Sequence, residues 1–137
     1  GGRMGKALAM LAPDGFTLRD QAIHIFDGIL QGRMSGLWSE AASLEKIERN
    51  DILQIFTYCT YLLRDLLMIV TGQGTELLFN IDLVEWLNRQ AHRWSEEKLI
   101  KALKMVETAR QALQANANSR LTSEALLIKM YDLVGEV

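Results

Sequence analysis

Few side chains in this sequence are suited to metal binding or nucleophilic catalysis: two histidines, His24 and His92, and one cysteine, Cys59. A ferritin-like metal site needs Glu-x-x-His on facing helices, but Gln21 and Arg89 stand three residues before the histidines. Two histidines and one cysteine do not complete a four-ligand zinc site, and their spacing does not suggest a catalytic triad. The sequence therefore predicts no catalytic residue, no metal ion and no cofactor.

Phosphate-binding features are also weak. Gly72 and Gly74 form no P-loop, because they follow a predicted helix instead of a strand and lack the Lys and the Ser or Thr of that motif. One predicted helix carries three lysines along one side, Lys98, Lys101 and Lys104. They could contact phosphates or an acidic partner, but a solvated face balanced by nearby glutamates is the favoured interpretation. We therefore expect only indirect involvement with DNA and no small-molecule substrate.

Length and charge bound the class of protein. The chain has 137 residues and a net charge of −2, which indicates about one domain with no general attraction to nucleic acid or to an anionic membrane. Cys59 is the only cysteine, so no intrachain disulfide can form, and a reducing, cytoplasmic environment is expected. The chain begins Gly-Gly-Arg without an initiator Met and shows no signal or transit pattern, so we expect a fragment of a longer protein.

The most apolar stretch, residues 51–71, is expected to form the central helix. Its apolar side chains recur at three- and four-residue intervals and cover more than one side of a helix. Arg64 and Asp65 interrupt the stretch near its middle, and a charged side chain at a bilayer centre costs roughly 2.5–3.5 kcal/mol, which argues against a membrane span. Gly72 supplies a left-handed helix stop. Other helices should therefore pack on at least two sides of this one.

Helical periodicity also marks the segments on either side of the central helix. They cover residues 3–11, 17–32, 35–47, 80–91, 95–115 and 122–133. The expected N-caps are Thr17, Asn80, Ser95 and Thr122. No stretch alternates with period two. The predicted fold class is all-α, a bundle of about six to seven helices around the central apolar one.

Two stretches are the most distinctive: LLRDLLMIVTG at residues 62–72 and ETARQALQANANSRLTSEALLIKM at residues 107–130. They resemble the C-terminal collar domain of bacterial DNA polymerase III clamp-loader subunits, most of all subunits of the delta-prime type. Members typically carry Arg-Asp before leucines in the central helix, an alanine-spaced helix ending in Asn-Ala-Asn, and a last helix opening with Leu and Glu. The corresponding residues here are Arg64, Asp65, Leu66, Leu67, Ala109, Ala112, Asn116, Ala117, Asn118, Leu121 and Glu124.

The resemblance also implies a domain boundary. Residues 1–14 would be the tail of a preceding AAA+ lid domain, and residues 15–137 the helical collar, or oligomerisation, domain. Pro13, at the clearest helix breaker in the sequence, lies at the junction. ATP-hydrolysing relatives place a phosphate-sensing arginine three residues after the glycine that opens the lid helix. Here Gly2 is followed at that place by Gly5, which cannot stabilise phosphate charge, so the resemblance implies that this fragment is not an enzyme.

Subunit assembly is the function that the resemblance implies. A collar domain holds the subunits of the ring that loads the sliding clamp onto primed DNA during replication, and its partners would be clamp-loader subunits of the gamma/tau and delta types in a hetero-oligomer. The last two predicted helices carry apolar and small residues beside their best inward stripe, and excess apolar surface is usually interface. The candidate interface residues are Ile100, Met105, Ala112, Leu127 and Met130.

A second interpretation stays open: a small helical DNA-contacting module or enzyme domain, unrelated to clamp loaders, that shares only the leucine spacing. The coding sequence upstream of Gly1 separates the two. A degenerate AAA+ region there would favour the collar domain, and a start codon just before Gly1 would favour the alternative.

Overall fold

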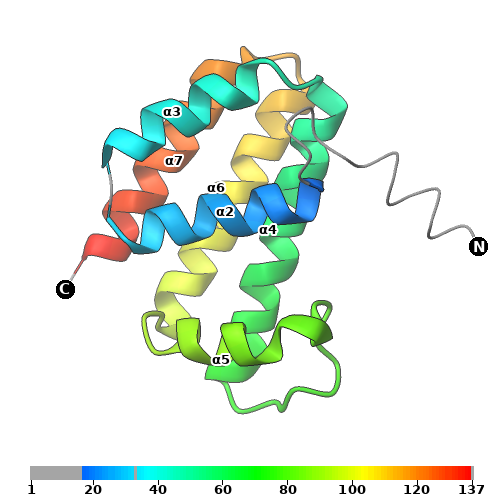
Figure 1. The fold of residues 1–137 in the computed structure, drawn as a ribbon, viewed down its shortest axis with the longest axis vertical. Coiled ribbons are helices and arrows are strands. Elements are labelled where there is room, and N and C mark those ends of the chain that lie inside the picture. Colours follow the sequence, from blue (N-terminus) through cyan, green and yellow to red (C-terminus); the bar gives the residue numbers. More distant parts are fainter. Residues whose placement is uncertain (1–16, 33, 137) are drawn as a thin grey trace, which may run out of the picture.

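The computed structural model describes residues 17–32 and 34–136 (Figure 1). Within these ranges the chain forms six α-helices and one short 3-10 helix and no β-strand, which confirms the predicted all-α class. The elements are α2 (Leu18–Leu30), α3 (Met34–Glu45), α4 (Arg49–Val70), η1 (Ile81–Leu83), α5 (Val84–Ala91), α6 (Glu96–Gln114) and α7 (Ser119–Gly135). The helix expected at residues 3–11 and the lid tail expected at residues 1–14 lie outside the described residues.

Helix α4 is packed by several other helices, as its apolar pattern predicts. It contacts α2, α5 and α6, and most of its apolar side chains between Ile52 and Leu66 are buried. By length and composition α4 could also cross a membrane. Its apolar side chains nevertheless pack inside the bundle, and the core helix of a globular protein has the same composition.

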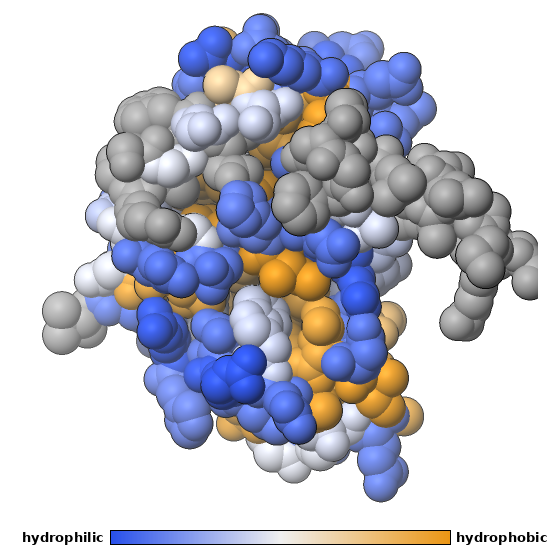
Figure 2. Space-filling model, viewed as in Figure 1, coloured by the Kyte–Doolittle hydropathy of each residue, from blue (hydrophilic) through white to orange (hydrophobic). Residues whose placement is uncertain are grey.

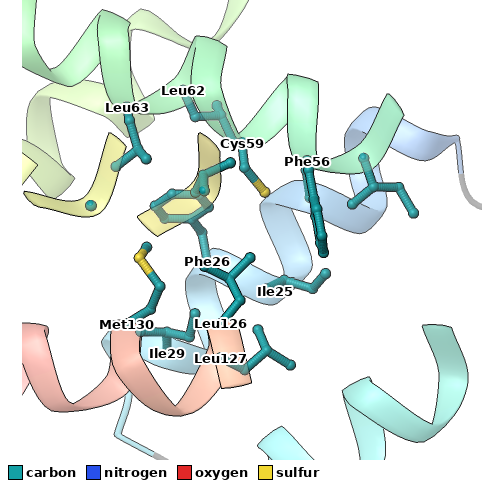
Figure 3. Close-up of a cluster of buried hydrophobic side chains, with 14 of the residues drawn as sticks. Ile25, Phe26, Ile29, Phe56, Cys59, Leu62, Leu63, Leu126, Leu127 and Met130 are labelled. Carbon is teal, nitrogen blue, oxygen red and sulfur yellow. The ribbon is translucent and has the colours of Figure 1, made fainter. Parts of the chain in front are cut away.

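The core is shared between α4 and α7, which lie behind opposite ends of α2 in the view of Figure 1. Helix α2 contacts both, and α6 also contacts both. Figure 3 shows the side chains that meet there, with Phe26 of α2 between Leu62 and Leu63 of α4 on one side and Met130 of α7 on the other. All of these side chains are buried. The expectation of one central helix is therefore correct for α4 but incomplete, because α7 is also packed on several sides.

Local signals place most of the helix ends. The hydroxyl of Thr17 accepts a hydrogen bond from the backbone N–H of Asp20 at 3.1 Å, and the hydroxyl of Ser95 accepts one from Lys98 at the same distance. Both predicted caps are confirmed. Gly72 has a φ of 75°, and the N–H of Gln73 donates to the carbonyl of Met68 at 2.9 Å. These are the features of a Schellman ending, in which a left-handed residue stops the helix.

Two predicted caps are wrong. Helix α7 begins three residues before Thr122, because Asn118 accepts the N–H of Leu121 at 2.9 Å and acts as the cap. Asn80 precedes η1 but its side chain makes no capping bond. Its amide instead donates to the carboxylate of Asp65 at 2.8 Å. Thr122 and Asn80 are both residue types that can cap a helix. For α7, the nearby Asn118 takes the capping role instead of Thr122. The side chain of Asn80 binds the distant Asp65 instead of the helix start.

Basic side chains from distant parts of the chain bind the carboxyl ends of three helices. Arg93 donates to the carbonyl of Leu30 at the end of α2, and Arg49 donates to carbonyls in the turn that ends α6. Lys98 donates to carbonyls at the end of α7. A cation is favourable at a helix carboxyl end, where unpaired carbonyls concentrate negative partial charge. Arg49 thus ties α4 to the end of α6 and Lys98 ties α6 to the end of α7, whereas Arg93 ties the turn after α5 to the end of α2.

Candidate assembly surface

The structure divides the five candidate interface residues into two groups. Ile100 is 41% exposed, and Met105 and Ala112 are partly exposed on α6. Leu127 and Met130 are each only 2% exposed and belong to the core. The expectation that these two lie beside the inward stripe is wrong, because α7 contacts α2, α3 and α6 and so buries more than one stripe. They cannot meet a partner without opening the bundle.

Met105 and Ala112 come together in one groove between α6 and α7, with a volume of about 380 Å³. Its walls consist mainly of small side chains, Ala109, Ala112, Ala117 and Ala125. Leu121 lines the same groove and is 65% exposed. Ile100 is not part of the lining. The groove is thus a largely apolar hollow with one large exposed apolar side chain, of the kind that marks a binding surface.

The turn between α6 and α7 sets the shape of this groove. Asn116 has a φ of 66°, which Asn tolerates better than most residues, and it ends α6. Asn118 then caps α7, so that Leu121 falls in its first turn. Arg49 of α4 holds the turn in place by donating to the carbonyl of Leu113 at 3.1 Å and to that of Ala117 at 2.7 Å. The hydrogen bonds of Arg49 therefore fix the position of the α6–α7 turn, which closes one end of the groove.

The groove between α6 and α7 carries little charge of its own. Lys129 lines it. Outside this lining, Arg110 pairs with Glu107 at 2.7 Å, and Arg120 pairs with Glu124 at 2.9 Å and with Glu45 of α3 at 3.2 Å. These pairs are at least partly exposed, so each contributes little to stability. None of these paired residues lines the groove, so its lining stays mainly apolar.

The three lysines of α6 do not form one charged stripe. Lys98 binds the end of α7, and Lys101 pairs with Glu97 at 3.3 Å. Lys104 is exposed, and Glu107, expected to balance the lysines, pairs with Arg110. Of the three lysines, Lys98 thus has a structural partner in α7 and Lys101 a local ion pair, and neither needs a phosphate to balance its charge.

Groups capable of chemistry are dispersed. Over residues 17–32 and 34–136, no group of three His, Cys, Asp or Glu residues is placed to hold a metal ion. His24, on α2, and His92, directly after α5, are exposed and lie outside the groove. Cys59 is fully buried, and burial raises the pKa of its thiol to about 12. The nucleophilic thiolate is therefore scarce near neutral pH.

Sequence reasoning missed Leu121 as a candidate interface residue. It was noted only as part of the family resemblance, and the assignment of Thr122 as the cap placed it before the helix. With Asn118 as the cap, Leu121 becomes a first-turn residue beside the groove. The available signal was the Asn-x-x-Leu spacing after the Asn-Ala-Asn turn.

Comparison with protein families finds a match to this chain. The family model described as "DNA polymerase III, delta subunit, C terminal" matches residues 36–131, which is more than half of the chain. The matched range includes the whole of α4 and α6 and most of α7, and hence the groove. No curated protein matches the chain, and no solved structure does.

Proposed function

This chain belongs to the family formed by the C-terminal domain of the DNA polymerase III delta subunit, and we propose that it is the collar domain of a delta-prime-type clamp-loader subunit. In this role it holds neighbouring subunits in the ring that loads the sliding clamp onto primed DNA. Its partners are subunits of the gamma/tau and delta types, and it acts in the cytoplasm. It contributes assembly and not catalysis.

The observation that carries this proposal is the groove between α6 and α7. It combines a largely apolar lining that includes four alanines with the exposed Leu121 and one charged residue, Lys129. Small residues allow a helix from another subunit to approach closely, and Leu121 can fit into that partner as an anchor. The sequence supports the delta-prime type through Gly5, which stands where a phosphate-sensing arginine is expected.

Filling the groove tests this function. In the full subunit, Ala112→Trp places a large ring in the space that the partner needs. Gln111→Trp is the matched control, because Gln111 is the exposed neighbour on α6 and does not line the groove. We expect Ala112→Trp to weaken co-elution with purified gamma/tau and delta subunits by at least about tenfold, as for an interface hot spot, and Gln111→Trp to have little effect.

A second variant protects this test against misfolding. Leu121→Asp changes a side chain that is 65% exposed, so the bundle should keep its helical circular dichroism and its cooperative unfolding. If both Ala112→Trp and Leu121→Asp are folded and still assemble like the unmodified subunit, the groove is not the assembly surface. Micromolar binding of ATP and Mg²⁺ to the 137-residue chain in calorimetry would contradict the non-catalytic role.

A further inference from the structure

A second apolar surface lies far from the α6/α7 groove. Leu77, Phe79 and Ile81 are 80%, 60% and 58% exposed, whereas Leu78 and Asn80 between them are buried. The segment thus directs alternate side chains outward and inward. It follows the carboxyl end of α4, at the opposite end of the long axis from the α6–α7 turn (Figure 1). Figure 2 shows apolar surface gathered over this lower end of the molecule.

This segment is held rigidly from the inside. The buried carboxylate of Asp65 accepts the N–H of Phe79 at 2.7 Å, and the N–H and side-chain amide of Asn80 at 2.8 Å each. The ring of Phe79 stacks on that of Tyr61 with centroids 4.6 Å apart. The outward apolar side chains are therefore already ordered without a partner, which lowers the entropic cost of binding.

A groove of about 550 Å³ lies beside the segment, and its charges favour one kind of partner. Its apolar lining is Leu67, Met68, Leu77 and Phe79. Its charged lining groups are Arg64, Asp65 and Glu96. Asp65 is occupied by its three donors, and Glu96 lies in the first turn of α6, where the helix amino end favours a carboxylate. Arg64 is exposed and forms no ion pair with any residue that the structure describes.

We propose that this surface, defined by Leu77, Phe79 and Ile81 with the adjoining groove, binds an amphipathic helix of another protein. The helix presents large apolar side chains to the groove and a carboxylate to Arg64. Area and shape alone would admit several occupants, but an unpaired guanidinium beside an apolar groove selects an acidic flank. The proposal concerns a surface separate from the α6/α7 groove and does not depend on the clamp-loader assignment.

Two synthetic helical peptides test the proposal with the 137-residue chain. One carries leucines one and two turns apart with glutamates along one flank, and the other has lysines in place of the glutamates. We expect fluorescence anisotropy to show tighter binding of the glutamate peptide, by roughly three- to tenfold, because reversing an exposed charge pair has an effect of this size. Arg64→Glu should reverse the preference between the two peptides.

Site variants locate the binding. Leu77→Ser and Phe79→Ser alter exposed side chains, so both variants should keep the helical circular dichroism. Each should lower the affinity for the glutamate peptide by about tenfold or more. Ala112→Trp, in the other groove, should leave this binding unchanged. Unchanged affinity in both serine variants, or equal affinity for the two peptides, would overturn the proposal. So would gel filtration showing a dimer of the chain that Phe79→Ser dissociates, since the occupant would then be a second copy.

Discussion

Replacing Asp65 with alanine should be one of the most destabilising single changes in this chain outside the apolar core. Its carboxylate is 1% exposed and accepts three hydrogen bonds, two from backbone N–H groups and one from the amide of Asn80. A buried donor left without a partner costs about 1–3 kcal/mol. Because the segment around Phe79 is near solvent, water can reach part of it, and we expect the lower end of that range for each donor, or about 3 kcal/mol in total.

Urea unfolding measures this loss. With a slope of about 2 kcal/mol/M for a domain of this size, a loss of about 3 kcal/mol lowers the midpoint by about 1.5 M. Asp132→Asn is the matched control, because Asp132 is an exposed carboxylate in the last turn of α7, where its loss should be neutral or slightly stabilising. Amide hydrogen exchange adds a local readout: the N–H of Asn80 should be protected in the unmodified chain and exchange faster in Asp65→Ala.

The two measurements together can refute the reasoning. If Asp65→Ala unfolds at the same urea concentration as Asp132→Asn, water replaces the carboxylate without cost and Asp65 does not hold the 79–80 segment. If stability falls but the exchange of Asn80 does not change, the energy lies in the packing of α4 and not in the three hydrogen bonds.

Four further experiments test other contacts of the fold. The Arg19 guanidinium donates to Asp82 at 2.8 and 2.9 Å and lowers the pKa of that carboxyl from 3.8. A carboxyl whose pKa is lowered by folding stabilises the fold at any pH above its unfolded pKa, so Asp82→Asn should cost about 0.2–1 kcal/mol at neutral pH. The difference in unfolding free energy should vanish as the pH falls through the native pKa, below 3.8. Cys59, with its pKa raised to about 12 by burial, should resist maleimide labelling at neutral pH in the folded chain and react at an ordinary thiol rate in denaturant, whereas rapid labelling of the native chain would contradict its burial. Arg49→Gln should lower the unfolding free energy by about 1–2 kcal/mol, because Arg49 binds two carbonyls at the end of α6, while Lys104→Gln, at an exposed position on α6, should stay within about 0.5 kcal/mol of the unmodified chain. Leu127→Asp should abolish the cooperative transition, since an unpaired buried charge costs several kcal/mol, and Ile100→Asp should remain folded; the reverse result would mean that the burial assigned to these two positions is wrong.

Features that depend on neighbouring residues could be predicted from the sequence. Helical periodicity predicted every described α-helix, and the caps at Thr17 and Ser95 and the stop at Gly72 are confirmed, because each depends on contacts within about five residues. Of the five predicted interface residues, only Ile100, Met105 and Ala112 are at least partly exposed. Sequence alone could not show that α7 is surrounded by three helices, and this arrangement buries Leu127 and Met130.

Polar side chains were the hardest to assign, because their partners lie far away in the sequence. Asp65 was recognised as a charge that argues against a membrane span, and Lys98 as a possible phosphate ligand or a solvated residue. In the structure, Asp65 holds a segment 14 and 15 residues away, and Lys98 binds carbonyls 36 and 38 residues away. Arg49 and Arg93 bind carbonyls between 63 and 68 residues away.

The long-range bonds of Arg49, Arg93 and Lys98 share one physical cause. In an all-α fold each helix leaves up to four carbonyls unpaired at its carboxyl end, and α2, α6 and α7 have no basic residue in their own last turn. A cation from a distant part of the chain supplies the missing donor in each case. Such a bond forms only when the two segments are correctly oriented relative to each other. It therefore favours this packing over other packings that would bury the same apolar area. The apolar stripes thus select a bundle, and the cations at the helix ends help to select its arrangement.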